Sequence, residues 1–465
     1  MKSILCVLVQ AVSACLFIAT TLAQDPGQPN VIYILADDLG YGDLSCYGQK
    51  KFETPNIDAL ADRGMMFTQH YSGSTVCAPS RSVLLTGLHT GHTPVRGNAE
   101  IEPEGQAEMS GTPYTVANHF KKAGYQTGCV GKWGLGYPGS ASEPLKMGFD
   151  RFYGYNCQRM AHCYYPAFLW NDDQRELLWG NVASQKKDYA PDLTHAQALD
   201  FIRENKDQPF FLFYAAIQPH ADMIAPEEHM KKFRGKFDPE PSHEADHYIA
   251  QPEPRAAFAA MVSVLDNYVG EVVKELETLG IDDNTMIIFT SDNGPHIEGG
   301  HDPDYFNSYG PLRGYKRDLY EGGIRVPMIA TWPAKIAAGT KSDHISAFWD
   351  FLPTVAEMIG EPLETEVDGI SMLPTLTGQG DQPQHKFLYW GFPAKGGRIA
   401  IRSGKWKAVR YDVSKKNVRP IELYDLSNDI GEKINVASEH PEIVSELDRL
   451  MKESHTDSPN PKFNF

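Results

Sequence analysis

The sequence predicts an α/β protein with a large, mixed but mostly parallel sheet flanked by helices and a smaller C-terminal α+β subdomain. Short apolar runs alternate with amphipathic segments over most of the 465 residues, as in chains whose helices connect parallel strands. From about residue 385 the runs become shorter and alternate with polar residues. That pattern is typical of antiparallel strands, and a final amphipathic segment predicts a terminal helix.

Each predicted strand of the main domain is an apolar run that ends at a polar or charged group. Thr54 and Pro55 are suited to the cap and first position of the first helix. Strands are predicted at 31–36, 126–130, 210–216 and 285–290, and helices at 55–63, 79–85, 115–123, 194–204 and 255–279. The C-terminal region is predicted to hold strands at 386–390, 398–402 and 405–410 and a helix at 441–451. Residues 221–254, rich in His, Pro and Glu, predict an irregular insertion.

Residues 1–23 predict a secretory signal peptide, which leaves a main domain at 24–384 and a subdomain at 385–465. Lys2 precedes an apolar run, and residues 21–23 supply a cleavage site. Cys15 also fits a bacterial lipoprotein signal, but the apolar run continues beyond it. No later stretch is apolar for long enough to cross a bilayer. We therefore expect an exported protein, periplasmic or extracellular, with no transmembrane segment and with lipid anchoring at Cys15 as the less favoured alternative.

The formal net charge of −17 and the lack of a basic cluster argue against a nucleic-acid partner. A site for an anion would need a few local cations and a metal ion. Five cysteines remain after residue 23, and an odd number in an exported chain suggests one reactive or modified thiol. Cys77 is the natural candidate, whereas Cys157 and Cys163 could pair across a short loop.

Polar side chains follow four predicted strands at their carboxyl ends, where open α/β sheets bind ligands. Three carboxylates and one amide oxygen from two of these strands suit Ca²⁺ or Mg²⁺ better than zinc. Either motif alone would also fit an ordinary turn. The groups are Asp37 and Asp38, Lys132, His220, and Asp292 with Asn293.

The segment Cys77-Ala78-Pro79-Ser80-Arg81 precedes a predicted helix, whose free N–H groups and dipole would favour an anion. Arg81 lies one turn along and would reach back towards Cys77. A lone cysteine here would equally fit a small buried hydrophobe, and a lone arginine a solvated helix residue.

Together these motifs resemble those of the type I sulfatases of the alkaline phosphatase superfamily, and the resemblance covers essentially the whole chain after residue 23. The matching segments, in the family's order, are 30–48, 54–64, 77–87, 124–136, 287–296 and 312–327, and segments 401–410 and 422–437 match the texture of the family's small domain. The resemblance implies the alkaline-phosphatase-like fold and hydrolysis of sulfate esters. It also implies that a maturation enzyme oxidises Cys77 to formylglycine, whose hydrated aldehyde attacks sulfur.

The resemblance further implies a role for each site residue. Arg81 and Lys132 would orient the hydrated aldehyde, and His220 and Lys316 would contact the sulfate and assist departure of the alcohol. Taken alone, His220 would fit a loop histidine and Lys316 a surface lysine. The implied Ca²⁺ ligands are Asp37, Asp38, Asp292, Asn293 and an oxygen of the matured residue 77.

One position departs from the family pattern. Many relatives carry a histidine where this chain has Gly134, and that histidine is assigned to deprotonating the sulfated hemiacetal. Glycine cannot act as a base. His296 and His301 are candidate substitutes or substrate contacts.

Residues 155–166 mix aromatics, an arginine and a histidine, which suits a sugar ring, although a disulfide-pinned structural loop is the equal alternative. The expected substrate is a sulfated carbohydrate, of galactose or N-acetylgalactosamine type by analogy with bacterial relatives. Two other functions stay open: hydrolysis of phosphate or phosphonate esters on the same fold, and non-catalytic binding of a sulfated glycan.

Overall fold

A ten-stranded sheet forms the centre of the computed structural model, which describes residues 28–111 and 113–465. The five central strands are parallel, and both edges carry antiparallel pairs, so the predicted mixed, mostly parallel sheet is confirmed. The predicted signal peptide and Cys15 lie outside the described residues. In sheet order the strands are β11 (Thr340–Ser342), β2 (Met65–Phe67), β10 (Met328–Thr331), β9 (Thr285–Ser291), β1 (Asn30–Ala36), β8 (Phe210–Ala215), β4 (Gln126–Lys132), β5 (Arg151–Tyr155), β6 (Phe168–Asn171) and β7 (Gln174–Leu177).

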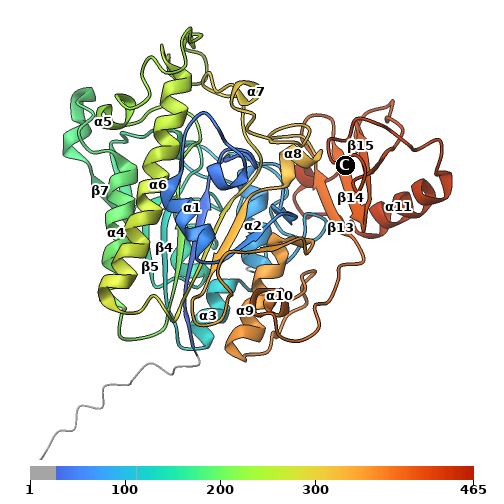
Figure 1. Cartoon of the computed structure of the whole chain (residues 1–465), viewed down its shortest axis with the longest axis horizontal. Helices are drawn as coiled ribbons and strands as arrows, with labels where there is room; N and C mark the ends of the chain where they lie inside the picture. The colour runs from blue at the N-terminus through green and yellow to red at the C-terminus, as the bar shows by residue number, and fades with distance from the viewer. Residues whose placement is uncertain (1–27, 112) are drawn as a thin grey trace, which may run out of the picture.

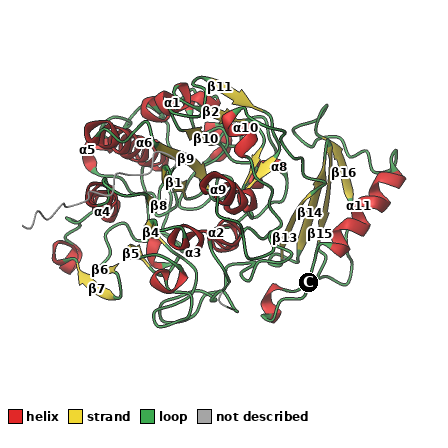
Figure 2. Ribbon diagram, turned by 90° about the horizontal axis from the view of Figure 1, so that it is seen from below, coloured by secondary structure: helices red, strands yellow, loops and turns green. Residues whose placement is uncertain are grey.

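Helices cover both faces of this sheet (Figure 2). Successive side chains of a strand point to opposite faces, and β1 therefore supplies Val31, Tyr33 and Leu35 to one apolar layer and Ile32 and Ile34 to the other. The first layer is completed by α2 (Cys77–Thr86), α3 (Val116–Lys122) and α9 (Phe351–Ile359). The second is completed by α1 (Pro55–Asp62), α4 (Ala190–Glu204), α5 (Glu227–Met230) and α6 (Pro254–Leu279).

The expectation that no stretch after residue 23 is apolar for long enough to cross a bilayer is wrong for helix α6, which is long and apolar enough by length and composition. However, 72% of its most apolar window is buried inside the fold. Figure 1 shows it lying along the sheet beside α4. The apolar character of α6 is therefore accounted for by its burial in the second layer.

Several predicted boundaries shift. Helix α2 begins at Cys77 rather than at 79, so that Pro79 is its third residue. Thr54 occupies the cap position of α1, but its hydroxyl bonds to Ser45 and Asp58 instead of capping the backbone. The sequence did not predict β5, β6 and β7, the short β2, β10 and β11, or the small pair β3 (His70–Tyr71) and β12 (Ser346–Ala347). The insertion 221–254 is irregular apart from α5.

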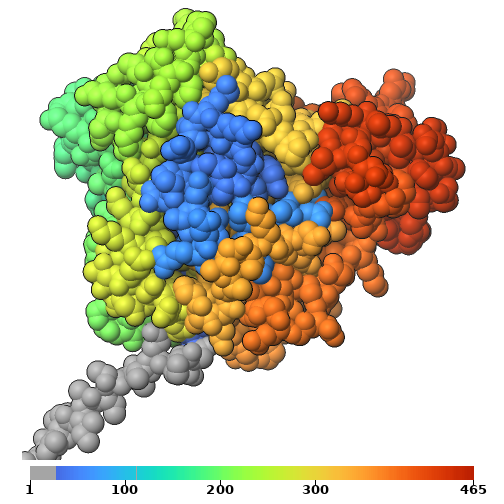
Figure 3. Space-filling view, in the orientation of Figure 1, coloured from blue at the N-terminus to red at the C-terminus, as the bar shows by residue number. Residues whose placement is uncertain are grey.

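The C-terminal region forms a separate four-stranded antiparallel sheet packed beside the main body (Figures 1 and 3). One strand was not predicted. Ile401, Ala408 and Leu423 pack against the terminal helix, and other side chains of the same sheet join the first apolar layer. The elements are β13 (Leu388–Phe392), β14 (Arg398–Ser403), β15 (Trp406–Tyr411), the unpredicted β16 (Glu422–Asp425) and α11 (Pro441–Glu453). Shorter helices α7 (Pro303–Phe306), α8 (Glu321–Ile324) and α10 (Leu373–Thr377) lie in the connections.

A buried ion cluster joins α8 to this second sheet. Lys407 Nζ lies 2.9 Å from Glu321 Oε1 and 3.0 Å from Glu432 Oε1, and all three side chains are fully buried. Arg325 adds a second cation at 3.2 Å from Glu321. Tyr71 O–H donates to the same carboxylate at 2.6 Å. The cluster therefore ties β3, α8 and β15 together by charge in the buried interior.

Candidate active site

Four neighbouring strands deliver the candidate residues to one edge of the sheet. In the order β9, β1, β8, β4, they end at Asp292, Asp37, the turn to His220, and Lys132. The register pairs Ala36 with Ser291, and the N–H of Asp292 donates to Ala36 O at 3.0 Å. Parallel pairing thus brings Asp37 and Asp38 next to Asp292. Asp38 N–H donates to Asp292 Oδ1, although 254 positions separate these two residues in the sequence.

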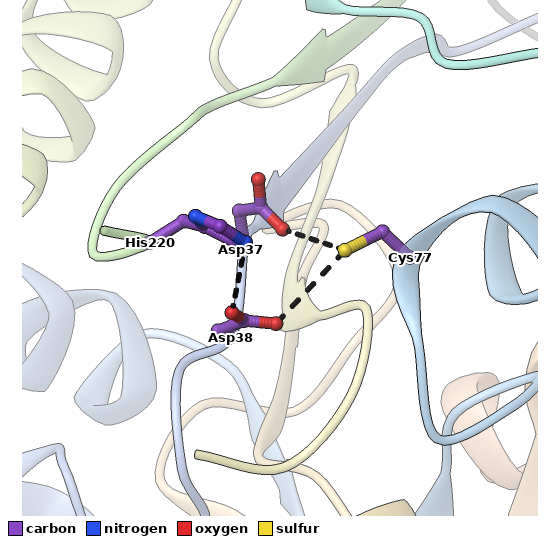
Figure 4. A group of neighbouring side chains, drawn as sticks. All are labelled: Asp37, Asp38, Cys77 and His220. Atoms are coloured by element: carbon purple, nitrogen blue, oxygen red, sulfur yellow. Dashed lines mark hydrogen bonds and ion pairs between the residues drawn. The ribbon is translucent and has the colours of Figure 1, made fainter. Parts of the chain in front are cut away.

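Cys77 is the first residue of α2 and faces the end of β1 (Figure 4). Its Sγ lies 3.3 Å from Asp37 Oδ1 and 4.0 Å from Asp38 Oδ1. The side chain is 1% exposed. Burial and then the charge of Asp37 raise the pKa of the thiol well above its ordinary value. An unmodified Cys77 would therefore be a protonated thiol and a poor nucleophile.

Two buried cations stand beside Cys77. Arg81 donates from Nε and Nη2 to Asp292 Oδ2, at 3.2 and 2.9 Å, and from Nη1 to Lys132 O at 2.5 Å. Lys132 Nζ donates to Asp37 Oδ2 at 2.5 Å. Burial is the largest single effect on Lys132 and lowers its pKa, but the charges of Asp37, Cys77 and Asp292 together raise that pKa overall. Both groups are charged, and the carboxylates hold them in place.

Lys316 and His220 face the opposite side of Asp38. Lys316 Nζ lies 2.7 Å from Asp38 Oδ2 and 3.0 Å from His220 Nε2. Burial opposes the charge of Lys316, but Asp38 and Glu298 raise its pKa well above the ordinary value. Burial and then Lys316 lower the pKa of His220 well below its ordinary value. His220 is neutral, and its Nδ1–H donates to Ala221 O, which leaves Nε2 to accept from Lys316.

Three buried carboxylates converge here and repel one another. Burial and then the charge of Asp37 raise the pKa of Asp292 to about 7. Among the described residues, Asn293 Oδ1 is buried without a hydrogen-bond partner, while its Nδ2 lies 2.6 Å from Asp38 Oδ1. Oxygen donors in this number fit a hard divalent cation, which would relieve the repulsion and satisfy the orphaned oxygen.

The two further histidines are less open than the sequence suggested. His296 is fully buried, its Nε2 donates to Pro219 O at 3.1 Å, and its Nδ1 accepts from Glu298 N–H at 3.0 Å. Both ring nitrogens are therefore occupied by the backbone. His301 is stacked on Phe258 at 3.8 Å between ring centroids. Neither histidine is among the residues that line the cavity around Cys77.

Several residues at the site escaped sequence reasoning. Glu298 lies 3.4 Å from Lys316 Nζ and 2.5 Å from Arg317 Nη2. Because it lies seven residues after the end of β9, its sequence position could have indicated that it belongs to the site. Tyr248 and His247 come from the irregular insertion and had no such signal. The suggested pairing of Cys157 with Cys163 is wrong: both are free, with Cys157 buried against Gly105 O and Cys163 exposed.

Comparison with known proteins agrees with this geometry. Residues 29–361 match the family model described as Sulfatase, and residues 314–457 match the C-terminal model of N-sulphoglucosamine sulphohydrolase. Human arylsulfatase A is 34% identical over 472 residues, covering 91% of this chain and 87% of its own. N-acetylgalactosamine-6-O-sulfatase of Bacteroides thetaiotaomicron is 31% identical over 513 residues, covering 93% and 94%.

Among solved structures, Ps i-CgsB superposes with a TM-score of 0.77 at 29% identity and covers 92% of each chain. The family match spans the main sheet and every site residue described above. Two curated sulfatases exceed 30% identity over nearly the full chain. The chain therefore belongs to the sulfatase family, enzymes that hydrolyse sulfuric esters on an alkaline-phosphatase-like fold.

Proposed function

We propose that this chain is an exported sulfatase that removes sulfate from carbohydrate, using a formylglycine made from Cys77 and a bound Ca²⁺. The observation that carries the proposal is the placement of Cys77 in the first turn of α2. There it faces Asp37 and Asp38 and is surrounded by three buried cations, those of Arg81, Lys132 and Lys316. Such a site stabilises a tetrahedral anion without reorganisation.

Asp37, Asp38, Asp292 and Asn293 would hold the calcium ion, which supplies Lewis-acid charge next to the sulfate oxygens. Formylglycine supplies a hydrated aldehyde, whose two hydroxyls allow attack on sulfur and later release of sulfate. Arg81 and Lys132 orient the oxygens of residue 77, because both side chains are fixed by carboxylates and by one backbone carbonyl.

Lys316 and His220 handle the proton of the leaving alcohol. The Lys316 ammonium donates to His220 Nε2, so the pair holds one proton at the wall of the cavity that contains Cys77. Because burial and Lys316 lower the pKa of His220, a proton transferred to its Nε2 is readily given to a departing alkoxide. We assign His296 a positioning role, since it links the backbone of Pro219 to that of Glu298.

A carbohydrate substrate is supported by two relatives. One is the bacterial N-acetylgalactosamine-6-O-sulfatase, and the other is Ps i-CgsB, which has been solved with k-i-k-neocarrahexaose at 28% identity to this chain. A sulfated galactose or N-acetylgalactosamine unit is therefore the first substrate to test. Export is supported by the leader pattern of residues 1–23, with lipid attachment at Cys15 as the alternative.

The modification is tested by mass spectrometry of the tryptic peptide 64–81, from protein produced together with an active maturation enzyme. We expect formylglycine at residue 77 and release of sulfate from a sulfated saccharide. The peptide 123–132 is an internal control, because Cys129 is also fully buried but stands outside the motif and should remain a thiol. Turnover by protein that keeps an unmodified Cys77 would contradict the proposed nucleophile.

Removal of calcium is expected to abolish activity and to lower the melting temperature, because three buried carboxylates would be left to repel one another. Asp38→Asn should weaken calcium binding by about 100-fold or more in calorimetry, through loss of ligand charge. Asp43→Asn is the matched control: this buried carboxyl accepts from Gly40 N–H at 2.8 Å and belongs to no metal cluster in the described chain. Equal calcium affinity in the two variants would remove Asp38 from the ligand set.

A further inference from the structure

The cavity that contains Cys77 has a volume of about 330 Å³ and two chemically different sides. One side is cationic and carries Lys316 with its partner His220. The other side, called the neutral side, is formed mainly by amides such as Gln158, and its two charged members, Glu100 and Arg159, lie 3.8 Å apart as an ion pair. A sulfate group would be attracted to the cationic side, which leaves the neutral side to face whatever carries the sulfate.

The one arginine on the neutral side does not supply free charge to the cavity. Arg159 donates to both carboxylate oxygens of Glu102, at 2.8 and 3.0 Å, and Glu100 lies 3.8 Å away. These contacts join loop 98–106 to loop 155–163. Asn98 completes the wall, since its Oδ1 accepts from Ala78 N–H at 3.2 Å next to Cys77. The wall is therefore fixed relative to the nucleophile position.

Gln158 is the unsatisfied member of this wall. It is 3% exposed, lines the cavity with Cys77, and its Nε2 has no hydrogen-bond partner within the described part of the chain. Leaving a buried amide unpaired costs free energy, so a ligand that pairs with it gains affinity. Its terminal bond can rotate to present either a donor or an acceptor.

Gly134 is what makes room for Gln158. A Cβ at residue 134 would lie 2.6 Å from Gln158 Cγ and 3.0 Å from Nε2. Residue 134 also has a φ of +73°, a conformation that favours glycine. The Gln158 amide can therefore occupy its place in the cavity only because residue 134 has no side chain.

Resting on the proposed carbohydrate substrate, we infer that Gln158, seated against Gly134, is a specificity-determining residue that hydrogen-bonds a hydroxyl or carbonyl oxygen of the sugar carrying the sulfate. The sulfate itself is held by the cations on the other side. Gln158 therefore recognises the part of the substrate that a simple aryl sulfate lacks.

The test compares two substrates on matured protein. One is 4-nitrophenyl sulfate, and the other is the fastest substrate from a panel of galactose and N-acetylgalactosamine 4- and 6-sulfates. Gln158→Ala should lower kcat/KM for the sugar sulfate by about 10- to 100-fold, as loss of a buried hydrogen bond to substrate does. The kcat/KM of the same variant for the aryl sulfate should stay within about twofold of the wild-type value. Gln174→Ala, an exposed glutamine on β7, is the control and should change neither rate.

Gly134→Ala supplies a second, independent variant. Its new Cβ should displace Gln158 and lower kcat/KM for the sugar sulfate selectively, as Gln158→Ala does. The double variant Gly134→Ala/Gln158→Ala should have a kcat/KM no lower than that of either single variant, since both changes remove the same interaction. Melting temperatures identify a variant that merely misfolds. Equal losses on both substrates, or no loss on either, would overturn the inference.

Failure of the proposed function would give a different result. If wild type releases sulfate from no ester, calorimetric titration of Cys77→Ala with the same sugar sulfates still measures recognition. Weaker binding by Cys77→Ala/Gln158→Ala than by Cys77→Ala would then support the role of Gln158. Identical binding, or none detectable in either protein, would reject it.

Discussion

Lys316→Met is expected to lower kcat for a sulfated sugar by about 100- to 1,000-fold, the usual loss when one preorganised charge is removed from a reacting centre. Lys316 Nζ contacts both Asp38 and His220, so the variant loses a cation beside the sulfate and the proton shared with His220. Loss of the shared proton slows the reaction most when the alcohol is a poor leaving group. A sugar hydroxyl needs that proton far more than an acidic phenol does.

A series of aryl sulfates with phenols of different acidity would measure this difference. In the variant, the rate should depend more steeply on the acidity of the phenol than in the wild type. Lys341→Met, on the exposed middle position of β11, is the control for removal of a lysine and should retain wild-type kinetics. A uniform loss across the series would assign Lys316 to sulfate binding alone and leave protonation of the alcohol to another group.

Lys407→Met is expected to destabilise the fold by about 3–5 kcal/mol, the range found when one partner of a buried ion pair is removed. Glu321 would then keep the charges of Arg325 and Arg402, while Glu432 would lose the cation 3.0 Å from its Oε1. Lys405→Met is the matched control, since Lys405 is half exposed and forms a surface pair with Asp425. Its loss should cost less than about 1 kcal/mol. Urea unfolding measures both.

The cost of Lys407→Met should depend on pH with a defined sign. Burial raises the pKa of Glu432 to about 7 even though Lys407 opposes the shift. A carboxyl whose pKa is higher in the folded state favours folding when protonated, and that contribution is lost as the pH rises through about 7. The variant should therefore lose more stability at pH 8 than at pH 5.5. An equal loss at both values would show that Glu432 does not titrate in this range.

The sequence predicted the catalytic edge of the sheet because its signals are local. Asp37, Lys132 and Asp292 each follow a run buried on both faces, so the strand and its carboxyl end can be placed without knowing the neighbours. Cys77 was placed just before its helix, because Pro79 resembles a first helical residue but stands third. All four positions of β7 are exposed, and that strand offered no apolar pattern to detect.

The remaining parts of the site depend on contacts between distant segments. Gln158 and His162 meet Asn98 and Tyr248 only because three connections fold over the same cavity. The local sequence of each connection does not indicate that its side chains will contact those of the other two. The suggested Cys157–Cys163 bridge failed for a similar reason, since only the packing shows that one thiol points inward and the other outward.

The order of strands in the sheet determines when each strand can find its neighbours during synthesis of the chain. Strand β1 is paired on both sides by strands from the later part of the sequence, β8 and β9. Until residue 291 is available, the central strand lacks a neighbour and the groups that enclose Cys77 from that side are missing. In the finished fold Cys77 is only 1% exposed and forms part of the cavity wall. If Cys77 is oxidised as proposed, we expect the oxidation to precede the pairing of β9, while the segment around Cys77 is still accessible as an extended peptide.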